Sequence, residues 1–424
     1  MLLLLRNTWA LLLGILLLML GNGMQGTLLG IRGAIEGFSA TEMSLVMTGY
    51  FLGFLISSRA TPGLIRRVGH VRVFAAMASI ISAAFILYAA APFLWAWALL
   101  RVVVGACFAS VYVVAESWLN DAATNETRGQ ALSAYMIVQL IGIVSAQALL
   151  NVADPGGYVL FVIISVAVSL SFAPILLTVS TAPVYATQKS MRLRELFHAS
   201  PLGFVGTVFL GAVFSALFGM ASVYGTERGL SVAAISAFIA AIYIGGLVMQ
   251  YPVGWISDRM DRRKLILGIT ALGAAMAALG AAAGSASVVA MTVAGFFIGG
   301  VANPLYSLLI AHTNDFLKPE DMSSASGGLL FLNGVGAIGG PLAVGAAMEG
   351  LGAWAFFGFI ALMFGAISLY AAWRMTRRPA LAPAETGVFT PIAPQATAVA
   401  ATAAAEIAAE AQIAAEAQAK DAAA

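Results

Sequence analysis

The chain has 424 residues, of which 61% are hydrophobic and only 9% charged, and its net charge is +2. Soluble domains carry about 25% charged residues, so this composition excludes a soluble globular protein. The apolar runs are long rather than alternating, which indicates a helical membrane protein. The single cysteine, Cys107, excludes an internal disulfide and a cysteine-built metal site.

Twelve apolar runs follow one another along the chain. A transmembrane helix needs about 20 apolar residues, and this criterion predicts an all-α membrane protein with twelve spans. The first run is too long for a signal-peptide core, so we expect a retained helix. The predicted spans are residues 8–30, 42–64, 73–91, 93–117, 131–152, 157–179, 201–225, 232–256, 265–283, 286–310, 324–347 and 351–373.

Basic residues gather at the chain ends and in the loops that follow even-numbered spans. The loops that follow odd-numbered spans contain only Arg32 and Arg228. The positive-inside rule therefore predicts that both termini and the even loops face the cytoplasm. The cations on that side are Arg6, Arg59, Arg66, Arg67, Arg72, Arg128, Lys189, Arg192, Arg194, Arg259, Arg262, Arg263, Lys264, Lys318, Arg374, Arg377 and Arg378.

The two halves of the chain carry similar features. Gln139 and Gly142 in the fifth predicted span recur as Asn333 and Gly336 in the eleventh, at an offset of 194 residues. This repetition predicts two pseudo-symmetric six-helix bundles with a substrate site at their interface. We expect an N-terminal bundle at 1–180, a cytoplasmic linker at 181–200, a C-terminal bundle at 201–375 and a tail at 376–424.

The tail differs sharply in composition from the spans. It is rich in Ala and Pro, with scattered Glu and Gln and almost no large apolar side chains. Such a segment lacks an apolar stripe with which to pack. We therefore expect a mobile or loosely helical cytoplasmic tail that does not pack on the bundles.

A dense charged loop separates two apolar runs in the second half. It reads Gly254-x-x-x-Asp258-Arg259-x-x-Arg262-Arg263-Lys264. This pattern resembles the loop signature of the major facilitator superfamily of transporters, with Asp261 in place of a customary glycine. In the functional interpretation, the glycine lets helices approach closely. Asp258 then pairs with an Arg or a helix end of a neighbouring span and clamps one conformation. In the alternative, the cations only anchor the loop.

A run of small residues occupies the eleventh span. Gly336-x-x-x-Gly340-Pro341-x-x-x-Gly345 resembles a signature that antiporters of the superfamily carry in span five. Its displaced position supports the fold and gives only weak support to antiport. The alternative is ordinary small-residue packing around a proline kink.

Arg101 lies about eight residues inside the fourth span, roughly 12 Å along the helix. It begins Arg101-x-x-x-Gly105, which resembles a further signature of the superfamily. Glu116 lies fifteen residues on, about 22 Å away, and cannot pair with it along the helix. We expect Arg101 to face the central cavity and to support substrate or a mobile ion pair. A snorkelling or structural arginine is the alternative.

Two stretches near the predicted cytoplasmic face are similar to one branch of the superfamily. These are Glu116-Ser117-Trp118-Leu119-Asn120 and Arg66-Arg67-x-Gly69-His70-x-Arg72. Together they resemble the YcaD-like bacterial branch, whose substrates we regard as undefined.

The superfamily resemblance also implies that spans one, four, seven and ten line the central cavity. Asn22 and Gln25 share one face of span one, and Asn303 and Tyr306 lie in span ten. We expect these four residues to line the cavity with Arg101. The alternative for the amides is a structural role as interhelical hydrogen-bonding groups.

Two carboxylates near the membrane surfaces are candidates for proton coupling, Glu36 and Glu116. Arg32 and Glu36 lie four residues apart at the outer end of span one and can pair on one helix face. The pair is either an outer gate or a solvated cap.

No phosphate-binding G-x-x-x-x-G-K-[ST] run, metal-ligand spacing or nucleophile–base constellation is present, so we expect neither an ATPase nor an enzyme, and no cofactor or metal. We expect a monomeric secondary transporter of the inner membrane that moves a small-molecule substrate by alternating access. Its partners are the lipid bilayer and the substrate, without nucleic acid; coupling to protons and the direction stay open. The alternatives are an uncoupled facilitator and a transport-inactive scaffold or sensor. Arg101 favours an anionic substrate, and the many aromatic and Met side chains favour an amphiphile.

Overall fold

The computed structural model describes residues 2–124, 127–177, 191–284, 286–377, 386–393 and 395–423. These residues form helices and no strands, and twelve helices among them are long and apolar enough to cross a membrane. The twelve predicted spans are thereby confirmed, in order, with boundaries that shift by a few residues. Residues 181–190 of the predicted linker, and 378–385 and 394 of the tail, lie outside the described residues.

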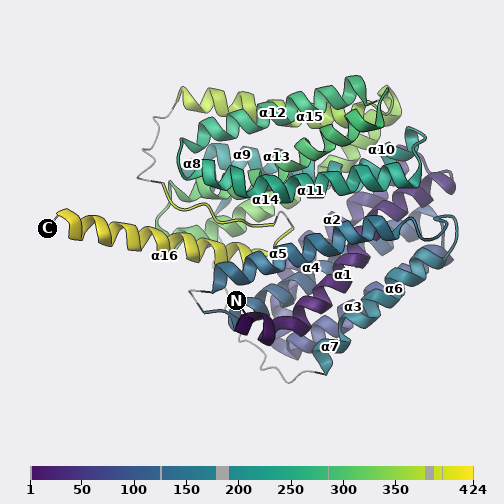
Figure 1. Cartoon of the computed structure of the whole chain (residues 1–424), viewed down its shortest axis with the longest axis horizontal. Helices are drawn as coiled ribbons and strands as arrows, with labels where there is room; N and C mark the ends of the chain where they lie inside the picture. Colours follow the sequence, from purple (N-terminus) through teal and green to yellow (C-terminus); the bar gives the residue numbers. More distant parts are fainter. Residues whose placement is uncertain are drawn as a thin grey trace.

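The spans fall into two groups of helices that lie side by side (Figure 1). The first group contains α1 (Leu2–Ile35), α2 (Ala40–Val68), α3 (His70–Ala90), α4 (Leu94–Ala122), α5 (Arg128–Leu149), α6 (Val159–Ser171) and α7 (Ala173–Leu176). The second contains α8 (Leu193–Ala199), α9 (Pro201–Ser215), η1 (Ala216–Met220), α10 (Ala221–Glu227), α11 (Val232–Ser257), α12 (Arg262–Ala283), α13 (Val288–Asn314), α14 (Pro319–Leu351) and α15 (Ala355–Met375). The last helix, α16 (Ala398–Ala423), projects from the bundles.

Glycines set the closest helix contacts, and they do so at equivalent places in the two bundles. A Cβ on Gly53 would lie 1.9 Å from the carbonyl oxygen of Val102, where α2 crosses α4. A Cβ on Gly245 would lie 1.9 Å from the carbonyl oxygen of Phe296, where α11 crosses α13. Any larger residue would push these backbones apart, because small residues are what permit such an approach. Spans two and four thus pack as spans eight and ten do.

The predicted repeat of an amide and a glycine also marks equivalent helix crossings in the two bundles. Gly142 brings α5 against α1, where an added Cβ would lie 2.8 Å from the carbonyl oxygen of Leu16. Gly336 brings α14 against α9, where an added Cβ would lie 1.9 Å from the carbonyl oxygen of Val208. The pseudo-symmetry of the two bundles is confirmed by these paired crossings.

One end of the molecule carries the basic loops, including Arg67, Arg259 and Lys318, and we call it the basic end; the opposite one is the far end. At the far end the two bundles pack directly on each other. A Cβ on Gly345 of α14 would lie 2.4 Å from Cβ of Ser44 on α2. A Cβ on Gly30 of α1 would lie 2.1 Å from the hydroxyl oxygen of Ser222 on α10. Both contacts join helices of different bundles, so the bundles meet directly at the far end.

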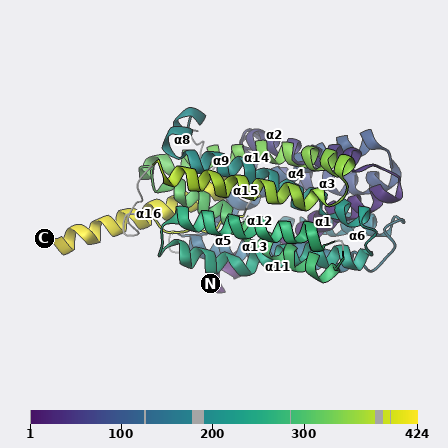
Figure 2. The same ribbon diagram turned by 90° about the horizontal axis from the view of Figure 1, so that it is seen from above.

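At the basic end the tail enters the space between the bundles, so the expectation of an unpacked tail is wrong. Figure 1 shows it in yellow between α5 and α14, and Figure 2 shows α16 leaving from the same end. Ile392 is 4% exposed, Ala396 is 3% exposed, and Thr397 and Ala401 are fully buried. Small side chains become buried without a broad apolar stripe, because they fit into a narrow gap between helices.

Candidate substrate cavity

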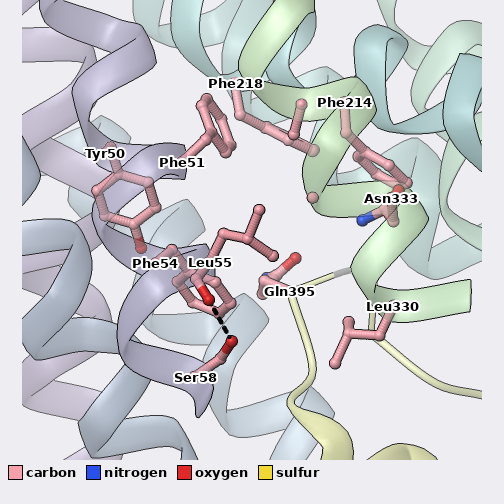
Figure 3. Close-up of a pocket in the computed structure, with 12 residues that line it drawn as sticks. Tyr50, Phe51, Phe54, Leu55, Ser58, Phe214, Phe218, Leu330, Asn333 and Gln395 are labelled. Carbon is pink, nitrogen blue, oxygen red and sulfur yellow. Dashed lines mark hydrogen bonds between the residues drawn. The ribbon is translucent and has the colours of Figure 1, made fainter. Parts of the chain in front are cut away.

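A cavity lies between the two bundles and is lined by residues of both (Figure 3). Its volume is about 80 Å³, and five aromatic rings from the two bundles line it. The polar groups at its surface are Ser58 and the amides of Asn333 and Gln395, and none of its lining side chains is charged. The rings are those of Tyr50, Phe51 and Phe54 from α2, Phe214 from α9 and Phe218 from η1.

A π-helical turn in span seven shapes this wall. Span seven is continuous through α9, η1 and α10, and η1 is wider than an α-helix. Such turns in α-helices occur frequently at functional sites. Phe218 lies in η1 and stacks on Phe214 one turn earlier, with ring centroids 5.5 Å apart, and also on Tyr243 of α11, at 4.8 Å.

A second cavity of about 40 Å³ lies on the other side of the tail. Four amides line it, those of Gln139, Gln250, Asn303 and Gln395. Gln395 of the tail lines this cavity and the first one. The tail therefore divides one interior space into two.

Of the predicted cavity residues, Asn303 lines the second cavity, and the others lie behind the walls. Gln25 donates to Asn22 over 3.0 Å, so the predicted shared face of span one is confirmed. Asn22 donates to the hydroxyl of Tyr112 over 2.9 Å, and the ring of Tyr112 lies 5.9 Å from that of Phe54 in the cavity wall. Tyr306 is fully buried and lines neither cavity.

Arg101 also lies one layer behind the wall. It is 3% exposed, and its guanidinium lies 4.9 Å from the ring centroid of Tyr50, which faces the cavity. One terminal nitrogen contacts the sulfur of Met47 at 3.4 Å, and Nε has no hydrogen-bond partner among the described residues. No carboxylate pairs with it in the part of the chain that the structure describes. The cation is held by an aromatic face and a polarisable sulfur instead.

The predicted pair at the far end forms. Arg32 and Glu36 approach to 2.6 Å, which confirms their pairing. Arg32 also donates to the carbonyl oxygen of Gly156 in the loop between α5 and α6. The pair therefore fastens the end of α1 to that loop; its role as a gate stays a prediction.

In the charged loop, Arg262 is the central residue. It is 2% exposed and forms an ion pair with Asp315, just past α13, whose side chain is 3% exposed. Asp258 lies 3.4 Å from the same guanidinium, and Ser257 accepts a hydrogen bond from it over 3.0 Å. Asp258 thus pairs with an arginine of its own loop, four residues on, rather than with one of a separate span, and its role as a conformational clamp stays a prediction. Asp315 is the partner of Arg262 that sequence analysis missed. An acid directly after the tenth span was its only signal.

The remaining charged residues of the loop act locally. Asp261 accepts from the backbone N–H of Arg263 over 3.0 Å and so caps the start of α12. Burial alone would raise the pKa of Asp261, but hydrogen bonds from Arg263 outweigh it and hold that pKa below its ordinary value. Arg259 is exposed, with its guanidinium 4.3 Å from the ring centroid of Trp255.

Gly254 allows the tail to approach closely, rather than another helix. The expectation that this glycine permits a close helix–helix contact is therefore wrong. A Cβ on Gly254 would lie 2.7 Å from the ring of Phe389. The backbone N–H of Phe389 donates to Asp258 over 2.9 Å. Both placed residues of the loop pattern therefore contact the tail.

Two small residues of span eleven serve packing inside the second bundle, whereas Gly345 packs on α2 of the first. Gly336 and Gly340 both face α9, where a Cβ on Gly340 would lie 2.5 Å from the carbonyl oxygen of Ala212. The helix α14 continues through Pro341 without interruption. This arrangement favours the packing interpretation of the pattern over the antiporter one.

The comparison with family models decides the identification. The model of the Major Facilitator Superfamily matches residues 11–249 and 203–409. The chain belongs to the major facilitator superfamily. Its relatives include an uncharacterised transporter of this family from Enterobacter sp. (strain 638), which is 29% identical over 340 residues, covering 79% of this chain and 87% of the relative. YcaD of Salmonella arizonae is 28% identical over 342 residues with the same coverage.

Solved structures of the family have the same fold. The nucleoside transporter NupG matches with a TM-score of 0.72 at 15% identity, covering 87% of this chain and 97% of NupG. A bacterial homologue of the human lysosomal transporter Spinster, solved in an inward-facing and unoccupied conformation, matches with a TM-score of 0.65 at 17% identity over 97% of both chains. The protein is accordingly a multi-pass membrane protein with a transporter fold and a YcaD-like sequence.

Proposed function

We propose that the protein is a secondary active transporter of the inner membrane that moves a small amphiphilic solute by alternating access. One observation carries this proposal: a cavity at the interface of two pseudo-symmetric bundles is closed at the far end by helix packing and is covered at the basic end by the tail. Two bundles that rock around a central site pass through such a state. The solute route then runs between the bundles.

The cavity wall supports an uncharged or weakly polar solute. Rings such as those of Tyr50 and Phe218 offer flat apolar surfaces, and the amide of Asn333 offers directional hydrogen bonds. A few polar groups in a mostly apolar wall are the usual means of orienting a small ligand. Arg101 would act through the ring of Tyr50 rather than by direct contact with the solute.

Proton coupling is the further part of the proposal, with Glu116 as the better candidate. Glu116 is 1% exposed and forms no ion pair within the described residues, whereas Glu36 is paired with Arg32. A buried carboxylate without a counter-charge in a span is a functional candidate by default. The competing function is uncoupled facilitation by the same cavity.

A vesicle experiment tests the proposal and identifies the solute at the same time. Membrane vesicles of both orientations are incubated with a metabolite extract of the host cell, energised, washed and analysed by mass spectrometry. We expect at least one solute to accumulate several-fold above vesicles that lack the protein. No such solute in either orientation would favour the scaffold or sensor alternative.

A matched pair of variants shows whether accumulation needs movement of the bundles. Gly345→Leu should abolish it, because the new side chain meets Ser44 and keeps the far end from closing. Gly339→Leu on the same helix has no neighbour within 4 Å of the added Cβ and should transport like the parent.

A protonophore distinguishes coupled from uncoupled transport. Accumulation that survives the protonophore would identify the facilitator, and accumulation that collapses would identify proton coupling.

The orientation is a separate prediction. The beginning of α1, α16 and the basic loops lie at one end of the molecule (Figure 1), which supports placing both termini in the cytoplasm. Green fluorescent protein fused to either terminus should fluoresce, and alkaline phosphatase fused to the C-terminus should be inactive. Active phosphatase at the C-terminus would contradict this orientation.

A further inference from the structure

The second bundle binds the main chain of the extended tail segment. Ser307 of α13 accepts from the backbone N–H of Ile392 over 2.9 Å and donates to its carbonyl oxygen over 3.1 Å. The N–H groups of Gly387 and Phe389 donate to the carboxylates of Asp315 and Asp258, over 3.1 and 2.9 Å. The main-chain groups of Ile392 are buried and need such partners, and at all three residues the partner is a side chain of the bundle. The segment is therefore held in a built site.

The first bundle holds the end of the same segment through Glu116 of α4. This carboxylate accepts from the N–H groups of Thr397 and Ala400, over 3.0 and 3.2 Å, and from the hydroxyl of Thr397. Ala400 lies in the first turn of α16, whose N–H groups have no acceptors within the helix, and Thr397 directly precedes that turn. A carboxylate there also meets the positive end of the helix dipole. Glu116 thus caps a helix that belongs to the tail.

The helix α16 connects both bundles beyond this point. On the second bundle, Ser323 of α14 donates to Thr402 over 3.2 Å, and Met322 packs on Ala405. On the first, Arg128 of α5 forms an ion pair with Glu406 at 3.0 Å. Because the tail is attached to both bundles at the basic end, it opposes a change in the angle between them.

The segment also fills the space through which a solute would pass. The side chain of Gln395 points into the first cavity (Figure 3) and lines the second. The volumes that remain, about 80 and 40 Å³, hold a few water molecules each.

We propose that residues 387–393 and 395–397 form an intramolecular plug that closes the cavity at the basic end, and that α16 holds the plug in place. Transport requires this plug to withdraw, so the tail is autoinhibitory. The proposal rests on the proposed function, since it takes the cavity as the route of the solute.

Accessibility of the cavity tests the plug independently of any solute. Ser58 lines the first cavity, and Ser58→Cys can be placed in a Cys107→Ala background, which removes the single native thiol. The purified protein in lipid nanodiscs is labelled with a charged maleimide. A chain that ends at Thr386 should label at least tenfold faster than the full chain. A chain that ends at Ile413, which keeps the plug, should label like the full chain.

Equal labelling of the full chain and the chain that ends at Thr386 would overturn the proposal. Should the shorter chain fail to fold, Ser307→Ala in the full chain takes its place, because it removes both hydrogen bonds to Ile392. We expect it to raise the labelling rate several-fold. The matched control is Thr270→Ala, whose lost hydroxyl bonds only within its own helix. Unchanged labelling in Ser307→Ala would count against the plug.

Transport by the same variants separates this proposal from the proposed function. In the vesicle experiment, the chain that ends at Thr386 should accumulate solute at a several-fold higher initial rate than the full chain. Faster labelling without any accumulation would leave the plug standing and refute the transport function. Accumulation at the parent rate with unchanged labelling would refute the plug and leave transport standing.

Discussion

Replacement of Arg262 with alanine is expected to lower the free energy of unfolding by about 3–5 kcal/mol, because it leaves a buried carboxylate without its counter-charge. The partner is Asp315, whose side chain is 3% exposed beside an arginine side chain that is 1% exposed. The same guanidinium donates to Gly387, so the variant also loses a contact to the plug. The measurement is denaturant unfolding of the purified protein in detergent.

Two controls make the Arg262 result specific. The double variant Arg262→Met/Asp315→Leu removes both charges at similar volume and should recover most of the lost stability, since well-packed apolar pairs replace buried ion pairs at little cost. Arg259→Ala, in the same loop but exposed, should change stability by less than about 0.5 kcal/mol. Equal losses in Arg262→Ala and Arg259→Ala would show that the loop only anchors the helices.

Arg101→Ala is expected to remain in the membrane at the parent level and to lose transport. Its guanidinium is buried without a carboxylate among the described residues, and an unpaired arginine in a span costs about 2.5–3.5 kcal/mol on insertion scales. Removal of the charge therefore removes this cost of inserting the helix into the membrane. It also frees the ring of Tyr50, which lies 4.9 Å from the guanidinium and forms part of the cavity wall.

Two further substitutions separate charge from shape at position 101. Arg101→Met keeps the length of the side chain and removes the charge, and it should transport at least tenfold more slowly than the parent. Arg101→Lys should recover part of the rate, because an ammonium keeps the charge but lacks the flat face that stacks on an aromatic ring. The readout is the initial rate of the solute that the vesicle experiment identifies. Failure of Arg101→Ala to accumulate in the membrane would make the residue structural, and parent-like transport would make it a bystander.

Much of the fold could be predicted because it depends on local properties. The number and order of the spans follow from the length of each apolar run, and a run such as 232–256 matches α11 within one residue. The pairing of Arg32 with Glu36 and of Gln25 with Asn22 follows from the three- and four-residue spacing of a helix.

The cavity wall was less predictable, since it depends on which helix faces converge. Tyr50 and Phe218 sit in apolar spans where nothing in their spacing separates a cavity face from a packed one. Arg101 was found by its charge, but its placement behind Tyr50 follows from the crossing of α2 and α4 at Gly53.

The sequence by itself determined the family, the twelve spans and the two-bundle plan, because hydrophobic length, basic loops and glycine spacing act on each helix or each crossing separately. Only the tertiary structure decided what the tail does. Residues such as Ala396 and Thr397 have no apolar period, and their burial arises from a gap whose walls come from α4, α5, α13 and α14. The acceptors that hold the tail are Glu116, which lies 281 residues from Thr397, and Ser307, which lies 85 residues from Ile392. Contacts over such separations depend on how the two bundles pack on each other, which no local sequence pattern predicts.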